Sequence, residues 1–270
     1  MTQVQLLNVN INNLAMSDLL NNLQSGGLVV TPNVDHLMKL QRDPDFYGVY
    51  QEADYRVCDS KILMYVSRFL GTPIIEKISG SDLFPAFYNY YRNDKSIKIF
   101  LLGAEEGIAE IARRKINSKV GRDIIIDTYS PPFGFEKDEG ECQKILRLIN
   151  SSDATVLAIG VGAPKQEMWI AKHRQYLHKV KIFLAIGATI NFEAGSIKRS
   201  PQWMSEVGLE WLYRLLSEPR RLWKRYLMDA VPFVYLVCKQ RLQLYKNPWS
   251  KMKDNHQDKI LSVFRNFKRM

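Results

Sequence analysis

The chain of 270 residues is 46% hydrophobic, 11% aromatic and 24% charged, which is enough apolar content for a sizeable core and excludes a disordered, collagenous or coiled-coil chain. Its net charge of +10 is unevenly distributed. Residues 1–195 carry 22 Lys and Arg against 22 Asp and Glu, whereas residues 196–270 carry 16 against 6. We therefore expect two parts, a domain over 1–195 and a basic appendage over 196–270.

The cysteine content and the hydropathy pattern indicate in which cellular compartment the protein works and how it can contact a membrane. Cys58, Cys142 and Cys238 are too few for a disulfide framework and lack the CxxC spacing of a zinc site, which favours a reducing compartment. The first residues show no signal-peptide pattern, and the apolar run at 230–238 falls short of the roughly 20 residues that span a bilayer. Any membrane contact is expected to be peripheral.

Apolar runs rich in β-branched residues predict strands at 28–31, 97–102, 124–127, 154–161 and 180–186. Helical periodicity predicts helices at about 53–70, 105–119, 139–150 and 165–176. This alternation indicates an α/β fold, a Rossmann-like and mostly parallel sheet flanked by helices. The runs at 154–161 and 180–186 are almost unbroken apolar, as in central strands, and ligands usually bind beyond the carboxyl ends of such strands.

The remaining segments are less regular. Residues 128–140 contain two prolines and predict a loop, for which a plain surface loop is favoured over a substrate lid. A helix is expected over 203–216, and a second one from Pro219, because the residue before a proline avoids the α conformation. The second helix is basic, aromatic and amphipathic, and completes a C-terminal basic helical appendage.

Polar side chains follow the first predicted strand. Thr31 and Asn33 can hydrogen-bond a ligand there, although a helix capped near Asn33 is the favoured interpretation of these residues alone. His36 is more often a packing residue than a ligand. Asp43 and Asp45 flank a proline and indicate a helix start rather than a metal site.

Asp59 lies between a short apolar stretch and an apolar helix from residue 62. Helix capping is the commoner role of such an aspartate. The catalytic alternative is a general base that takes the proton of an attacking hydroxyl, a role that typically contributes ~10²–10⁴ in rate.

The segment 160–167 joins a buried strand to a helix, so backbone amides at that helix start can face an anionic ligand. Gln166 and Glu167 would then present polar groups to the same cleft. Glycines needed only for a tight turn are the equally favoured alternative for Gly160 and Gly162.

The basic tail can be a solvated surface, a nucleic-acid patch or a docking face for anionic lipid and phosphate. Its interleaved aromatic residues argue against pure solvation, and lysines or arginines near an anionic leaflet contribute about 1 kcal/mol each. A nucleic-acid partner is not expected, since no helix-turn-helix, zinc or RNP pattern accompanies the charge.

Several motifs, taken in order, resemble the WecG/TagA/CpsF glycosyltransferase family. They are 31–36 (TPNVDH), Asp59, 78–82 (ISGSD), 162–167 (GAPKQE), 187–195 (GATINFEAG), 199–201 (RSP), 208–214 (GLEWLYR) and 218–221 (EPRR). The segments GxPxQE and GLEW are the most specific of them, and the ordered set spans about residues 28 to 226.

The resemblance implies an inverting, metal-independent and cofactor-free transfer of a hexose-type sugar, most of all N-acetylmannosamine, from a UDP donor. The acceptor would be a sugar on a polyprenyl diphosphate carrier, at the cytoplasmic face of a bacterial membrane, in the synthesis of surface polymers such as teichoic acid. One base suffices for inversion, and cations and helix amides can stabilise departing UDP. Deletion of residues 196–270 is expected to abolish turnover while leaving the α/β domain folded.

The resemblance also assigns residues. Asp59 matches the family's proposed general base, and Thr31 and Asn33 match its active-site polar pair. Substrate-binding positions are expected at Gly162, Pro164, Gln166, Glu167, Asn191, Arg199, Arg214, Arg221, Lys224 and Arg225, the last five in the basic appendage.

Four positions depart from the family pattern: Ser60 for glycine, Lys77 for arginine, Ser200 for alanine and Asn191 for aspartate. They bear on donor choice more than on fold, because an amide and a carboxylate recognise a uracil or sugar edge differently. They also allow a catalytically silent UDP-sugar or polyanion-binding protein as the alternative function. A homo-oligomer is possible if the core hides apolar surface when the tail is undocked.

Overall fold

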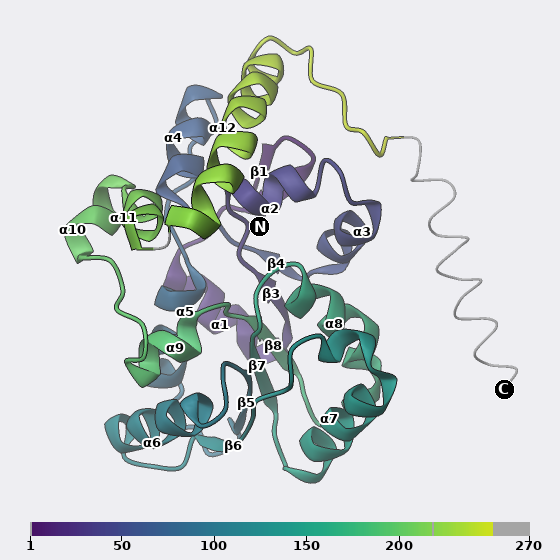
Figure 1. The fold of residues 1–270 in the computed structure, drawn as a ribbon, viewed down its shortest axis with the longest axis vertical. Helices are drawn as coiled ribbons and strands as arrows, with labels where there is room; N and C mark the ends of the chain where they lie inside the picture. The colour runs from purple at the N-terminus through teal and green to yellow at the C-terminus, as the bar shows by residue number, and fades with distance from the viewer. Residues whose placement is uncertain (1, 218, 251–270) are drawn as a thin grey trace, which may run out of the picture.

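The computed structural model describes residues 2–217 and 219–250 (Figure 1). Its centre is a six-stranded sheet, parallel throughout, in the order β4-β3-β8-β7-β5-β6. The strands are β3 (Gly27–Val30), β4 (Tyr55–Arg56), β5 (Ile99–Gly103), β6 (Ile125–Tyr129), β7 (Val156–Gly160) and β8 (Ile182–Ala185). The Rossmann-like α/β fold predicted from the sequence is confirmed.

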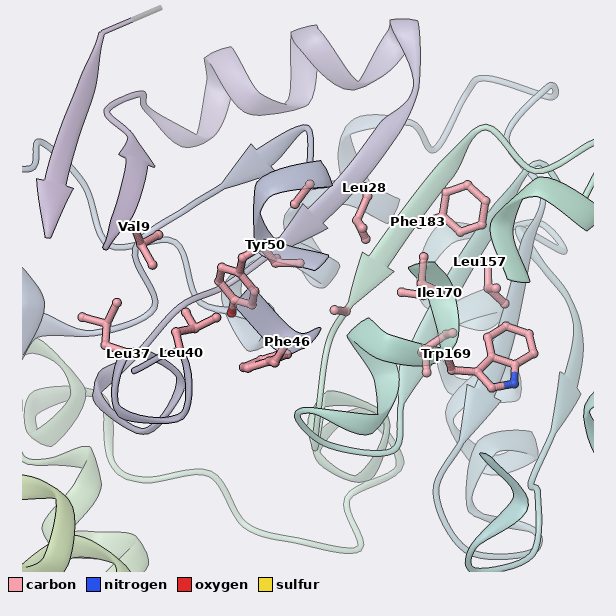
Figure 2. Close-up of a cluster of buried hydrophobic side chains, with 14 of the residues drawn as sticks. Val9, Leu28, Leu37, Leu40, Phe46, Tyr50, Leu157, Trp169, Ile170 and Phe183 are labelled. Atoms are coloured by element: carbon pink, nitrogen blue, oxygen red, sulfur yellow. The ribbon is translucent and has the colours of Figure 1, made fainter. Parts of the chain in front are cut away.

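Helices cover both faces of this sheet, because alternate strand residues point to opposite sides. One face packs on α2 (Val34–Lys39), α3 (Pro44–Glu52), α7 (Glu139–Ser151) and α8 (Lys165–His173). The other packs on α1 (Met16–Asn22), α5 (Gly80–Tyr90), α6 (Ile108–Val120) and α9 (Thr189–Ala194). Figure 2 shows the first of these clusters, in which Leu28, Leu157 and Phe183 of the sheet lie near Ile170 and Trp169 of α8.

The five predicted strands are confirmed within one or two residues, but the helix predicted over 53–70 is wrong in its first part. Residues 55 and 56 form β4, and the Val57 N–H continues the pairing to Val30 O at 3.0 Å. Helix α4 (Lys61–Phe69) begins only after Ser60, whose side chain caps it by accepting the Ile62 N–H. Pairing with β3 thus holds the segment before Asp59 extended.

The helix predicted over 203–216 is also wrong as one element. Gly208 has a φ of 85°, a left-handed conformation that ends α10 (Gln202–Val207) before α11 (Glu210–Ser217) begins. Helix α12 (Pro219–Arg241) starts at Pro219, as predicted. No described helix is both long enough and apolar enough to cross a membrane.

The appendage folds back onto the α/β domain. Phe233 and Val237 of α12 are buried in the core cluster that includes Leu37 and Met38 of α2. Near the end of α12, the Gln240 side chain accepts the Leu7 N–H at 2.8 Å and donates to Gln5 O at 2.9 Å. Those two residues belong to a hairpin of β1 (Gln3–Leu6) and β2 (Val9–Asn12), which the sequence pattern did not predict.

Candidate active site

Two neighbouring strands bring Asn33 and Asp59 together. Asn33 follows β3 and Asp59 follows β4, and the Asp59 N–H donates to Pro32 O at 3.0 Å. The Asn33 side chain donates from Nδ2 to Asp59 Oδ2 at 3.2 Å, and its Oδ1 accepts the His36 N–H at 3.1 Å. Asn33 therefore caps α2, as the sequence favoured, and also contacts Asp59. Thr31, at the end of β3, is buried.

The role of Asp59 as a helix cap is excluded, since Ser60 caps α4 instead. His36 is a buried packing residue, as predicted, with its Nδ1 2.6 Å from the Tyr50 hydroxyl. Asp43 and Pro44 start α3, and the Asp43 carboxylate accepts two N–H groups of its first turn. The helix start predicted at this site is confirmed.

Asn33 and Asp59 line a cavity of about 430 Å³. Helix α4 contributes one wall, with Lys61, Ile62 and Val66. The appendage contributes the facing wall, which consists of Gly208, Glu210 and Trp211 at the start of α11 and Asp229, Ala230, Phe233 and Val234 of α12. The cavity is thus completed only by the docked appendage.

A second cavity of about 470 Å³ shares Lys61, Lys77 and Ser205 with the first. Arg199 lines it and pairs with Asp82, which also accepts Lys77 Nζ at 2.8 Å. Although partial burial raises the pKa of Asp82, hydrogen bonds from Lys77, Ser79 and Arg199 outweigh it and lower the pKa to about 2. Asp82 therefore stays ionised and fixes both cations in the wall of the second cavity.

The substrate-binding residues predicted within segment 162–167 line neither cavity. Gln166 and Glu167 are buried, and Gln166 Oε1 accepts the N–H groups of Gly162 and Gly187 at 3.2 and 3.1 Å. Gln166 Nε2 donates to Glu167 Oε1 at 2.8 Å. Gln166 thus ties together the loops that follow β7 and β8, and substrate contact by Gly162, Pro164, Gln166 and Glu167 stays a prediction.

Burial raises the pKa of Glu167 to about 7, with Asp35 adding to the rise and with Gln166 and Lys39 opposing it. Its Oε2 has no hydrogen-bond partner among the described residues. The ammonium of Lys39 lies 2.8 Å from Asp35 Oδ2 and donates to Ala163 O at 3.2 Å. Glu167 is therefore a buried carboxyl group that titrates near neutral pH.

The ends of β5 and β7 and the loop after β8 pack backbone against backbone. A Cβ atom on Gly160 would lie 2.5 Å from Gly187 O, and one on Gly103 would lie 2.6 Å from Gly160 O. Both distances are too short for any side chain. Gly160 is therefore required for the approach of neighbouring loops, in line with the structural alternative for this segment.

The other predicted residues lie apart from the cavity around Asp59. Asn191, in α9, donates from Nδ2 to Ser196 Oγ at 3.4 Å and lines neither cavity. Ser200 lines the second cavity with a buried hydroxyl that has no partner among the described residues. The side chains of Arg214, Arg221, Lys224 and Arg225 lie outside what the structure describes, so their roles stay predictions.

Sequence reasoning missed most of the wall that the appendage supplies. The GLEW segment was noted as a family motif without a role, and its Gly208, Glu210 and Trp211 line the cavity. Gly208 allows the α10–α11 turn to approach α4, since a Cβ there would lie 3.1 Å from Lys61 Cβ. The Tyr65 hydroxyl of α4 also donates to Val207 O at 3.3 Å. This motif was the one available signal for the wall.

A parallel α/β sheet with a carboxylate and a polar cavity beyond neighbouring strand ends is the arrangement of a Rossmann-like enzyme. The chain belongs to the "Glycosyl transferase WecG/TagA/CpsF family", whose sequence profile matches residues 4–247. The protein is therefore a glycosyltransferase, and the family resemblance inferred from its motifs is confirmed.

Two relatives are named N-acetylglucosaminyldiphosphoundecaprenol N-acetyl-beta-D-mannosaminyltransferase. The chain is 30% identical to that of Bacillus spizizenii over 202 residues, which cover 75% of each chain. It is 26% identical to that of Bacillus subtilis strain 168 over 235 residues, which cover 87% of this chain and 88% of the relative.

Proposed function

We propose that the protein transfers N-acetylmannosamine from a UDP donor to the sugar of a polyprenyl-diphosphate-linked acceptor, with inversion and without a metal ion. The names of the two relatives support both the transferred sugar and an N-acetylglucosaminyl-diphosphoundecaprenol acceptor. The observation that carries the proposal is the Asp59 carboxylate, held by Asn33 in the wall of a cavity large enough for a sugar. The product would enter a surface polymer such as teichoic acid.

In this mechanism, Asp59 accepts the proton of the acceptor hydroxyl as its oxygen attacks the anomeric carbon of the donor. The bond from that carbon to the diphosphate breaks on the opposite side, and UDP leaves with the electron pair. A single base is sufficient for such an in-line displacement. Asn33 orients the carboxylate by its hydrogen bond to Oδ2.

Cations stabilise the charge that develops on the departing diphosphate. Arg199 lines the second cavity, which adjoins the cavity around Asp59, and its guanidinium would lie beside the donor diphosphate there. The basic residues Arg214, Arg221, Lys224 and Arg225 of the appendage would add further positive charge, and the guanidinium groups of the three arginines would pair with phosphate oxygens in fixed geometry. Closure of the appendage would then couple donor binding to assembly of the site.

An anionic membrane surface is the expected location of the reaction, because the acceptor carries a lipid. Residues 196–270 hold 16 Lys and Arg against 6 Asp and Glu, and Trp203 and Trp223 are 60% and 55% exposed. Basic residues with exposed aromatic anchors favour peripheral binding to anionic lipid. We therefore propose that the enzyme works on the cytoplasmic face of the cell membrane.

The test is UDP release in EDTA, with liposomes, a soluble polyprenyl-diphosphate N-acetylglucosamine analogue and a panel of UDP-sugars. Asp59→Asn should lower the rate by ~10²–10⁴ while UDP still binds. Asp45→Asn is the matched control, since Asp45 is an exposed aspartate in the first turn of α3. Equal rates in wild type and Asp59→Asn would exclude Asp59 as the base. UDP binding without turnover for any donor and acceptor would favour the silent binder.

A further inference from the structure

The cavity beside Asp59 changes character along its length. Its inner end is polar, with Asn33, Asp59 and Lys61. Its outer part lies between α4 and α12 and is lined mainly by apolar side chains, Ile62 and Val66 on α4 and Ala230, Phe233 and Val234 on α12, with Asp229 of α12 beside them. Each set has the spacing that places residues on one face of a helix, so two apolar stripes face each other across the cavity.

The two helices run side by side at the same end of the molecule (Figure 1). Residues 62 and 66 lie across the cavity from residues 230 to 234, and farther along both helices the Arg241 guanidinium lies 6.0 Å from the centre of the Phe69 ring. The nine residues of α4 span about 13 Å. The groove therefore leads from Asp59 along α4 toward Phe69.

The apolar lining is accessible on its α12 side, whereas Phe233, Ile62 and Val66 pack against the core. Val234 is 59% exposed although it lines the cavity, and Ala230 is exposed as well. Beyond the groove, Phe69 and Tyr235 also expose more than half of their surface. An apolar groove that opens among exposed aromatic side chains suits a ligand that is hydrophobic along its length and continues out of the protein.

We propose that this groove between α4 and α12 holds the first isoprene units of the acceptor lipid. The assignment rests on the proposed function. The diphosphate would lie beside Lys61 and Lys77, whose positive charges complement it, and the attached sugar would reach Asp59. The rest of the lipid would leave the protein near Phe69 and Tyr235. Helix α4, which carried no membrane signal in the sequence, would then contact the lipid directly.

Acceptor chain length and groove-filling variants test the proposal by kinetics. In detergent, an acceptor with a farnesyl chain should show a KM at least tenfold below that of one with a short alkyl chain. Ala230→Trp and Val66→Phe should remove that advantage by filling the groove from either wall. Val231→Trp is the matched control, since Val231 is 68% exposed and does not line the cavity.

Equal KM values for the two acceptors in wild type would overturn the proposal, and so would equal losses with both acceptors in the variants. A binding measurement separates this result from failure of the proposed function. A photoreactive farnesyl diphosphate should label α4 and α12, and Ala230→Trp should suppress the labelling. Labelling there without turnover would keep the lipid site and reject the transferase reaction, whereas labelling confined to other segments would reject the site.

Discussion

Asn33 Nδ2 donates to Asp59 Oδ2 at 3.2 Å, while Oδ1 of the same amide accepts the His36 N–H at 3.1 Å. One side chain thus caps α2 and orients the carboxylate at the end of the neighbouring strand. An amide is suited to both tasks, because it carries a donor and an acceptor on the same group. Capping and orientation can therefore be separated by substitution.

We expect Asn33→Asp to keep the cap and lose the donor. Aspartate is as good an N-cap as asparagine, so the cap is kept. The new carboxylate, however, lies beside that of Asp59 and repels it, which should lower the free energy of unfolding at neutral pH and much less at acidic pH. Asn33→Ala should lose about 1 kcal/mol at either pH. Both variants should lower kcat/KM at least tenfold, since Asp59 is no longer oriented. Urea unfolding and UDP release measure the two effects. Full activity in Asn33→Asp would show that the hydrogen bond to Asp59 is dispensable.

Glu167 should make the stability of the protein depend on pH. Burial raises the pKa of this carboxyl group from 4.5 to about 7, so between these values the folded state holds a proton that the unfolded chain has lost. Stability therefore falls as pH rises through this window, by on the order of 3 kcal/mol in total. Below pH 4.5 both states are protonated and the penalty is absent.

Glu167→Gln removes the titration, so its free energy of unfolding should exceed that of wild type by more at pH 8 than at pH 5. Urea unfolding at the two values measures the change. Glu106→Gln, at an exposed glutamate, is the control and should leave the wild-type pH dependence in place. A parallel pH dependence in wild type and Glu167→Gln would show that Glu167 is ionised at low cost in the folded state.

The sequence predicted the strongly patterned part of the fold. The apolar runs that became β7 and β8 are long enough to identify, and helix periodicity located α6, α7 and α8. The hairpin was missed because its strands, QVQL and VNIN, alternate apolar with polar residues and form no apolar run, and β4 was missed because it has only two residues. Pairing with β3, not local preference, keeps residues 55 and 56 extended.

The candidate site, like the fold, could be predicted from the sequence only in part. Asn33 could be located because it follows a predicted strand, whereas Asp59 was assigned through the family resemblance, since β4 was not predicted. Trp211 and Phe233 could not be located, because their place in the wall depends on how the appendage folds back across α4 and α2. That packing joins residues far apart in the sequence and leaves no local pattern. Gln166 was identified as a polar residue near a loop, but its partners at Gly162 and Gly187 are visible only in three dimensions.

Alanine should lower the free energy of unfolding by different amounts at Gly160, which ends β7, and at Gly162, two residues later. At Gly160 the new Cβ would lie 2.5 Å from Gly187 O, and backbone cannot yield as a side chain can, so Gly160→Ala should cost about 3 kcal/mol. At Gly162 no atom lies within 4 Å, and only its φ of 84° opposes a side chain, so Gly162→Ala should cost about 1 to 2 kcal/mol. Urea midpoints give the comparison. A larger loss at Gly162 would contradict the close approach at Gly160.

Exposed tryptophans of the appendage should carry membrane binding. Trp203 and Trp223 are more than half exposed within the basic segment, and indole rings favour the interface of a bilayer. Replacing both by serine should weaken co-sedimentation with anionic liposomes about tenfold. Raising the salt concentration should weaken binding of wild type as well, because exposed charges are screened.

Phe133→Ser provides the control for exposed aromatic surface. Phe133 is 98% exposed and lies between β6 and α7, which Figure 1 places at the opposite end of the molecule from α12. Its loss should leave sedimentation unchanged, because Phe133 belongs to residues 1–195, in which positive and negative charges balance. Equal weakening by the two sets of substitutions would mean that aromatic exposure alone drives binding. Unchanged binding in the double tryptophan variant would leave the lysines and arginines as the sole anchors, and salt would then abolish it entirely.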